Sequence, residues 1–457
     1  MLPRSIPPER LLDDPVASAA LAATRVLRDS GFTALLAGGA VRDLLLGRAP
    51  LDYDIATDAA PAEVGALFPR SHAVGARFGV VVVVHREVAI EVTSFRREGP
   101  YPDGRRPAWV APGTVATDAA RRDFTINGMY LDPGSGQVID LVGGLADLEA
   151  RLVRAIGDPA ERFREDHLRI LRAVRLASQL EFQIDPATLA AARESAALVG
   201  RVSAERVRDE LSRLLSAPRP GRSVRLLEEV GLVAILLPEL AALKGVEQPP
   251  THHPEGDVYT HTLLMMDALA SPPLDLAWSV LLHDVGKPLT SMFDETADPP
   301  RIRFPGHEAR GAEIAAGMLA RLRYPREFIE RVTLIVRQHM QFKDVPQMRG
   351  ATLRRLLARP TFPLELELHR LDCLASHGDL SAYHALLDLR QAHSTEELDP
   401  APLLRGTDLL ARGVAPGPII GRLLRQARDL QLEGVLRDRD QALAWLARAL
   451  AAGPAPR

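Results

Sequence analysis

Several residue types are scarce in this chain of 457 residues. It has one cysteine, Cys373, which excludes an internal disulfide framework and suits a reducing compartment. Lysine occurs only at Lys244, Lys287 and Lys343, so nearly all basic residues are arginine. Asn127 is the single asparagine. A residue type this rare gives weight to the motif in which it stands.

Neither charge nor hydropathy points to a partner. The net charge of -3, with 25% charged residues, is ordinary for a soluble enzyme, so nucleic-acid binding must depend on local arginines. No uncharged apolar run approaches membrane-spanning length. The N-terminal letters MLPRSIPPERLLDDP place proline and acids where a signal peptide has an apolar core. We therefore expect a cytoplasmic protein, and the length predicts two to four domains.

The stretch 35–54, LLAGGAVRDLLLGRAPLDYD, predicts a strand, a glycine turn, a short helix and a second strand. Gly38 and Gly39 leave room for backbone N–H groups to approach an anion closely. Arg42 falls on the first helical turn, near the positive end of the helix dipole. These features are typical of a phosphate-binding turn.

Two carboxylates follow in the same stretch. Asp52 and Asp54 alternate with apolar residues, so on a strand both would project from one face. Paired carboxylates hold divalent cations, as in-line displacement at a phosphate requires. Taken singly, the glycines fit an ordinary helix start and the acids fit a solvated strand. Their occurrence together favours a site for a triphosphate and magnesium.

The strings GGAVRDLLLG and LDYDIAT resemble the first signature of the class II tRNA nucleotidyltransferases, or CCA-adding enzymes, and of their bacterial poly(A) polymerase relatives. The resemblance extends over about residues 31–440. It implies a polymerase-beta-like head in which Asp52 and Asp54 bind Mg²⁺. It also implies template-independent addition of C and A to the 3′ end of tRNA from CTP and ATP.

Two β-branched runs, at residues 78–84 and 88–95, predict a hairpin because polar residues separate them. Glu91 lies on the second strand as a candidate third metal ligand, and a plain surface acid fits equally well. Residues 96–115 are polar and rich in proline and glycine, which is typical of a mobile functional loop. Its letters YPDGRRP match the flexible loop of the family.

Residues 121–129, RRDFTINGM, resemble the second family motif. Arg121 and Arg122 supply fork-shaped donors for phosphate, while Asp123 and Asn127 could hydrogen-bond a ribose hydroxyl. A surface ion-pair cluster is the plainer alternative. The rare asparagine and the family match favour nucleotide binding.

Residues 163–182, FREDHLRILRAVRLASQLEF, keep apolar residues at near-helical spacing and predict one amphipathic helix. Asp166 and Arg169 would then be neighbours on adjacent turns, where a plain salt bridge explains them. A carboxylate and a guanidinium can also read the pairing edge of C or A. The resemblance assigns this role to the pair, with Arg172 and Arg175 nearby on phosphate or as support.

A second site, a metal centre, is predicted C-terminal to the arginine-rich helices. A His-Asp dipeptide ends an apolar helix, and further histidines follow on later helices, which indicates a transition-metal site. The string HDVGKP resembles the HD phosphohydrolase superfamily, in which a metal-bound water attacks phosphate esters. The same ligands can also form an inactive structural site. The candidate ligands are His261, His283, Asp284, His307, His339 and Asp372.

We expect an α+β fold, with a small mixed α/β nucleotidyltransferase head followed by all-α neck, HD and tail domains. The neck, dense in arginine, is expected to bind the RNA. The expected boundaries are 1–30 for an N-terminal helix, 31–150 for the head, 151–245 for the neck, 250–395 for the HD domain and 400–450 for the C-terminal segment.

Three alternatives to CCA addition stay open at this stage. The enzyme could add only CC or only A, although the intact loop at 96–115 argues against CC-only addition. It could be a poly(A) polymerase, because the head motifs are shared. It could also be an HD phosphohydrolase whose head is a non-catalytic RNA-binding module.

Overall fold

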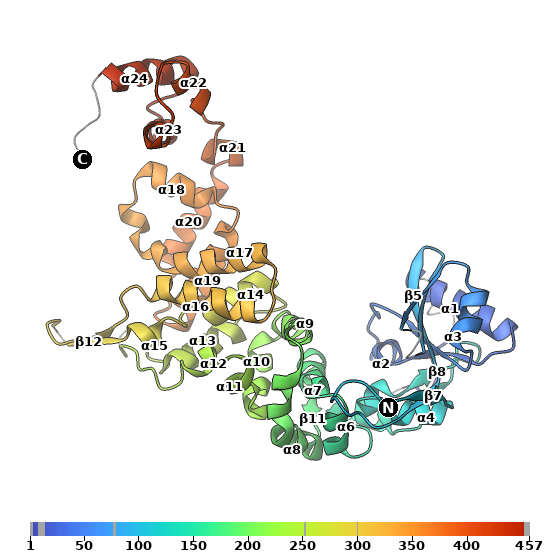
Figure 1. Ribbon diagram of the computed structural model, residues 1–457. Helices are drawn as coiled ribbons and strands as arrows, with labels where there is room; N and C mark the ends of the chain where they lie inside the picture. The colour runs from blue at the N-terminus through green and yellow to red at the C-terminus, as the bar shows by residue number, and fades with distance from the viewer. Residues whose placement is uncertain (1–2, 8–13, 76–78, 251–252, 299, 452–457) are drawn as a thin grey trace. The chain divides into compact units, whose positions relative to one another are not determined.

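The computed structural model describes residues 3–7, 14–75, 79–250, 253–298 and 300–451 (Figure 1). Internal contacts divide the chain into two units. The first comprises Met1–Ala241 with Leu269–Leu274 and Arg321–Tyr324, and the second comprises the remaining residues. Each unit is described by itself.

A seven-stranded sheet in the order β3-β4-β5-β2-β1-β8-β9 forms the centre of the head. The β-branched run VVVVVH alternates between buried and half-buried positions, as expected for a strand with one face on the core. All neighbouring strands pair antiparallel except β2 and β5, which run parallel. The strands are β1 (Ala34–Ala37), β2 (Asp54–Thr57), β3 (Ser71–Gly75), β4 (Val80–His85), β5 (Val88–Ser94), β8 (Tyr130–Leu131) and β9 (Val138–Ile139).

Helices α1 (Pro15–Asp29) and α3 (Pro61–Leu67) contact each other and both cover β4 and β5. Helix α1 begins at proline, and the Asp14 side chain accepts a hydrogen bond from Val16 N–H, so its first turn is well capped. Its alanine-rich face is buried against the sheet. The other head elements are α2 (Gly39–Leu45), β6 (Arg96–Glu98), β7 (Val110–Pro112), α4 (Val115–Ala120), η3 (Thr125–Asn127) and α5 (Gly144–Glu149).

The predicted hairpin is confirmed as β4 and β5, within the described residues, since residue 78 lies outside them. The predicted second strand is partly wrong. Strand β2 begins at Asp54, so Asp52 precedes the strand and does not share its pleat.

The neck belongs to the same unit as the head and consists mainly of helices. The prediction of one helix over 163–182 is wrong, because α6 (Pro159–Glu165) ends before α7 (Leu168–Leu180) begins. Asp166 takes extended angles, φ -137° and ψ 106°, at this break. The remaining elements are β10 (Leu152–Val153), β11 (Gln183–Ile184), α8 (Pro186–Ser195), η4 (Ala196–Arg201), α9 (Ala204–Leu215), α10 (Pro220–Val230), α11 (Leu232–Leu236) and α12 (Pro238–Ala241).

The second unit is helical apart from one hairpin, β12 (Met292–Asp294) and β13 (Arg301–Arg303). Trp278 is completely buried on an almost wholly apolar helix. None of the helices in the described part of the chain has the length and apolar character needed to cross a membrane. The helices of the second unit are α13 (Val258–Asp267), α14 (Leu274–Leu282), α15 (Lys287–Thr290), α16 (His307–Arg321), α17 (Arg326–Gln338), η5 (His339–Gln347), α18 (Gly350–Leu357), α19 (Phe362–Ala375), α20 (Ser381–Gln391), α21 (Thr395–Leu398), α22 (Gly406–Leu410), α23 (Pro418–Leu432) and α24 (Arg439–Ala451).

A glycine allows α16 to approach the end of the His-Asp segment closely. A Cβ at Gly286 would lie 2.1 Å from the carbonyl oxygen of His307 and 2.7 Å from the amide nitrogen of Gly311. Backbone atoms cannot rotate away as a side chain can, so we expect Gly286→Ala to destabilise this unit by about 1–3 kcal/mol.

Gly317 on α16 provides the matched control, because a Cβ there would meet nothing within 4 Å. Gly317→Ala should be neutral or stabilising by up to about 1 kcal/mol. Thermal unfolding of both variants tests the close approach, and equal melting temperatures would contradict it.

Candidate functional sites

A cavity of about 520 Å³ lies within the first unit, between head and neck residues. Its wall has a surplus of positive charge, since eight arginines face five carboxylates. Such a wall suits a polyanion accompanied by cations. The arginines are Arg42, Arg96, Arg121, Arg122, Arg169, Arg172, Arg175 and Arg206, and the acids are Asp52, Asp54, Glu91, Asp123 and Asp166.

The glycine turn lies at one end of this cavity. Gly38 has a φ of +73°, which favours glycine, and a Cβ there would lie 3.2 Å from Nη1 of Arg122. Arg42 on α2 donates from Nη1 to Oδ1 of Asn127, at 2.6 Å. The single asparagine therefore positions a predicted phosphate ligand, which is a different contact from the expected ribose bond.

Three carboxylates line the cavity wall: Asp52, Asp54 and Glu91. Burial and the charges of Glu91 and Asp52 together raise the pKa of Asp54 to about 7, against the opposing effect of Arg122. A pKa this high indicates that too little positive charge lies near the Asp54 carboxylate to stabilise its ionised form. Clustered carboxylate oxygens are the ligands that hard divalent cations prefer.

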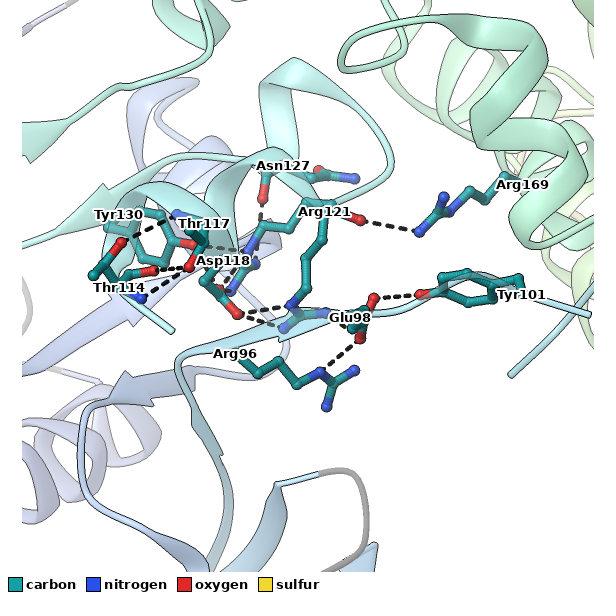
Figure 2. Close-up of polar contacts among 11 residues, drawn as sticks. Arg96, Glu98, Tyr101, Thr114, Thr117, Asp118, Arg121, Asn127, Tyr130 and Arg169 are labelled. Atoms are coloured by element: carbon teal, nitrogen blue, oxygen red, sulfur yellow. Dashed lines mark hydrogen bonds and ion pairs between the residues drawn. The ribbon is translucent and has the colours of Figure 1, made fainter. Parts of the chain in front are cut away.

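A buried carboxylate, Asp118, connects the adjacent arginines of the second motif (Figure 2). Its Oδ1 accepts from Nε and Nη2 of Arg121, at 2.8 and 2.6 Å. Its Oδ2 accepts from Arg122 and, at 2.6 Å, from the hydroxyl of Tyr130. The paired arginines lower the pKa of Asp118 even though burial raises it. Residue-type patterns offered no signal for this residue, because an acid three residues before an arginine is common.

Glu98 is a second acid in this network. Its Oε1 accepts from Nε of Arg96 at 2.7 Å and from Nη1 of Arg121 at 3.3 Å, and its Oε2 accepts from Tyr101 (Figure 2). Glu98 ends β6, so it ties the loop between β6 and β7 to the arginine pair.

The same loop contacts the break between α6 and α7. The carbonyl of Gly104 accepts from His167 N–H at 3.2 Å. A Cβ at Gly104 would lie 2.1 Å from Nε2 of His167, so this contact requires glycine. The predicted loop is therefore packed beside Asp166.

The side chains of Asp166 and Arg169 do not pair with each other, although Arg169 N–H donates to the Asp166 carbonyl at 2.9 Å. Asp166 accepts from Leu168 N–H at 3.1 Å and from Nη2 of Arg206 at 2.8 Å. Arg169 donates to Glu165 at 2.5 Å and to the carbonyl of Arg121 at 3.0 Å. The plain salt bridge is thus excluded. Each side chain is held by other partners while it lines the cavity.

The two downstream arginines are held in ion pairs. Arg172 donates to Asp123 at 2.8 and 2.5 Å, and although burial raises the pKa of Asp123, the charge of Arg172 holds it well below its usual range. Arg175 donates to Glu210 of α9 at 2.6 Å. These ion pairs join the head motif and two neck helices around the cavity.

In the second unit, a cavity of about 690 Å³ contains four of the six predicted HD ligands in its wall. The ligand atoms of His261, His283 and Asp372 lie within 4.8 Å of one another. Those of Asp284, His307 and His339 do likewise. The six predicted ligands therefore fall into two neighbouring triads, which a 3.0 Å contact between Nε2 of His283 and Oδ2 of Asp284 joins, and His253 and Glu255 form a third group with His261.

The hydrogen bonds of the imidazoles fit metal ligation. Nδ1 of His261 faces Oε1 of Glu255 at 2.6 Å, and Nδ1 of His283, His307 and His339 faces backbone carbonyl oxygens at 2.7–2.8 Å. Each Nδ1 must therefore donate, which leaves a lone pair on each Nε2. Nε2 of His307 and Nε2 of His339 lie only 3.2 Å apart, an arrangement that a shared cation relieves.

Burial and the neighbouring His283 and His307 lower the pKa of His339 to about 3, so its imidazole stays neutral. Nε2 of His261 is buried without a hydrogen bond, although Oδ1 of Asp372 lies 3.1 Å away. Glu255 was not predicted. It comes from the linker that precedes α13, and it also contacts Nδ1 of His253 at 2.9 Å.

Three family models match the chain. They describe a poly A polymerase head domain over residues 34–154, a probable RNA- and SrmB-binding site of polymerase A over residues 181–244, and an HD domain over residues 257–376. A CC-adding tRNA nucleotidyltransferase of Thermus thermophilus is 36% identical over 428 residues, which cover 90% of this chain and 92% of the relative. A multifunctional CCA protein of Halorhodospira halophila is 37% identical and covers 86% and 94%.

The chain belongs to the tRNA nucleotidyltransferase family. The crystal structure of the Bacillus stearothermophilus CCA-adding enzyme in complex with CTP matches with a TM-score of 0.73 at 28% identity, over 96% of this chain and 98% of that one. The expected nucleotidyltransferase head and helical HD-containing region are confirmed by these matches.

The fold of this tRNA nucleotidyltransferase gathers all the predicted head residues at one cavity. The predicted HD residues likewise form the two triads of the second unit. The residues that sequence analysis missed, Asp118, Glu98, Arg206 and Glu255, all contact predicted ones through a hydrogen bond or ion pair.

Proposed function

We propose that this chain adds C and A nucleotides to the 3′ end of tRNA, using CTP and ATP and releasing pyrophosphate. The observation that carries this proposal is the single cavity in which Asp52 and Asp54 share a wall with the arginines and with Asp166 and Arg169. A relative named as a CCA-adding enzyme and one named as a multifunctional CCA protein support it. So does the CTP complex of a structurally similar enzyme.

We propose Mg²⁺ as the cation of the carboxylate cluster, held by Asp52 and Asp54 with Glu91 beside them. The raised pKa of Asp54 supports this assignment, because these acids have too little positive charge around them. When bound, divalent cations would lower the pKa of the RNA 3′-hydroxyl and neutralise the leaving pyrophosphate.

The chain itself contributes mainly positioning and electrostatic stabilisation. Gly38 and Gly39 offer backbone N–H groups at the start of α2, and Arg42 and Arg122 flank this turn. Asp118 holds Arg122 in place, so the Arg122 guanidinium is already ordered before the triphosphate binds. Prior ordering of this kind lowers the entropy cost of binding.

Asp166 and Arg169 are proposed to choose the incoming base. A carboxylate has about four lone-pair sites and a guanidinium has five N–H donors. The two bonds to Asp166 and the bonds to Arg169 leave capacity on both. An exocyclic amine and a ring acceptor, presented by both C and A, match this donor–acceptor pair.

The neck is proposed to bind the tRNA acceptor end through its backbone and 2′-hydroxyl groups. The match of residues 181–244 to a probable RNA-binding region supports this role. Its helices α8 to α10 belong to the same unit as the cavity, so RNA held there could place its 3′ end at the carboxylates.

CC-only addition is the second candidate, because the relative that matches 90% of this chain is named for it. One assay separates the possibilities. tRNA transcripts ending before the first C, after C and after CC are incubated with CTP, ATP or both, and their 3′ ends are sequenced. We expect addition to stop at CCA.

Termination at CC would support the second candidate, and a long A tail would indicate a poly(A) polymerase. Asp54→Ala should abolish every product, whereas His283→Ala, in the other unit, should leave transfer unchanged. Transfer that survives Asp54→Ala would contradict the assignment of the head as the catalytic module.

We further propose that the two triads of the HD domain hold transition-metal ions and hydrolyse phosphate esters. The converging Nε2 lone pairs support ligation, and the adjoining cavity provides room for a substrate. When bound, such ions supply an activated water. Hydrolysis should be lost in His283→Ala and kept in Asp54→Ala.

The pKa of Asp54 gives a pH prediction for the magnesium site. Since a proton and Mg²⁺ compete for a carboxylate whose pKa is about 7, Mg²⁺ affinity should rise about ten-fold from about pH 6 to about pH 8. Asp54→Asn should remove this rise. Calorimetric titration of the nucleotide-free enzyme tests it, and a pH-independent affinity would refute it.

A further inference from the structure

Two carboxylates, Asp118 and Glu98, share the guanidinium of Arg121 in the wall of the nucleotide cavity (Figure 2). Glu98 has no role in the transfer reaction proposed above, whereas Asp118 holds Arg122 in place there. The Arg121 guanidinium therefore pairs with two carboxylates in the part of the cavity wall where the triphosphate is proposed to bind. The two acids are held in different ways, and the difference suggests different roles.

Asp118 is held firmly. Its side chain is 1% exposed and accepts hydrogen bonds from Arg121, Arg122 and Tyr130. It also lies on α4, whose start is capped reciprocally by Thr114 and Thr117. Loss of Asp118 would release both arginines, so it is part of the scaffold.

Glu98 is held mainly by Arg96 of β6 and by Tyr101 of the loop between β6 and β7. Its carboxylate contacts Arg96 at 2.7 Å and Arg121 at the longer distance of 3.3 Å, and its other oxygen accepts from Tyr101. Arg121 is already fixed by two short bonds to Asp118. The Glu98 carboxylate is therefore not needed to orient Arg121, but its charge reduces the positive potential of the wall.

We propose that the negative charge of Glu98 attenuates the positive charge of the arginine wall and so lowers its affinity for triphosphate and pyrophosphate. This inference rests on the proposed function, because it presupposes that the wall binds those anions. An enzyme that adds nucleotides in succession must release pyrophosphate after each addition. A carboxylate behind two of the arginines weakens the product complex as well as the substrate complex.

The sign of the effect separates this role from a structural one. If Glu98 merely oriented Arg96 and Arg121, its loss would weaken anion binding. If it attenuates their charge, Glu98→Gln should tighten binding of inorganic pyrophosphate about three- to ten-fold. That is the size expected for one charge removed at about 8 Å in a medium of effective dielectric constant about 40.

The test is calorimetric titration of the full chain with inorganic pyrophosphate and with CTP in magnesium buffer. Glu87→Gln is the control, because Glu87 also pairs with an arginine, Arg70, but its side chain is 79% exposed. This control variant should bind pyrophosphate and CTP with the affinity of the wild type. Glu98→Asp keeps the charge and should also resemble wild type. Glu98→Ala carries the same expectation as Glu98→Gln and replaces it if the glutamine variant does not fold.

In turnover assays, Glu98→Gln should lower the inhibition constant for pyrophosphate by the same factor without changing the choice between C and A. Unchanged or weaker pyrophosphate binding in a variant that melts like wild type would overturn the role of Glu98. Tighter binding by Glu98→Asp would overturn it as well. If the wild type bound neither pyrophosphate nor CTP, the proposed function itself would fail.

Discussion

The pairing of half-buried arginines with a few carboxylates is the constraint on which the cavity of the first unit depends. Desolvated guanidinium groups are costly unless they have partners, so Asp118, Asp123 and Glu210 each hold arginines that line the cavity. These acids satisfy only part of the positive charge. The surplus remains directed at the cavity, where the triphosphate is proposed to supply the missing anions.

The same pairs connect the parts of the first unit. Asp123 of the second motif pairs with Arg172 of α7, and Arg175 of α7 pairs with Glu210 of α9, so ion pairs extend from the head into the neck. Asp166 stands at the break between α6 and α7, where Arg206 of α9 fixes it. A base-reading group in such a position depends on the neck for its orientation as well as on its own helix.

The sequence was sufficient to predict many of the residues that line the cavity, and insufficient for the residues that orient them. Gly38, Asp54 and Arg42 stand in a compact local pattern, so their common site could be predicted. Asp118 and Glu255 act through contacts that depend on folding, and nothing in their local sequence distinguishes them from surface acids. The predicted helix over 163–182 extended too far towards its N-terminus, because residue types do not show the break at which the Asp166 side chain accepts a hydrogen bond from Leu168 N–H.

The central claim is that protein side chains, with no nucleic-acid template, choose the base at the break between α6 and α7. Single-nucleotide incorporation by Asp166→Ala tests it most directly, with CTP compared with UTP and ATP compared with GTP. We expect selectivity to fall by about ten-fold or more while the affinity for pyrophosphate stays near wild type. Unchanged selectivity in a variant that still binds pyrophosphate would contradict base reading by Asp166.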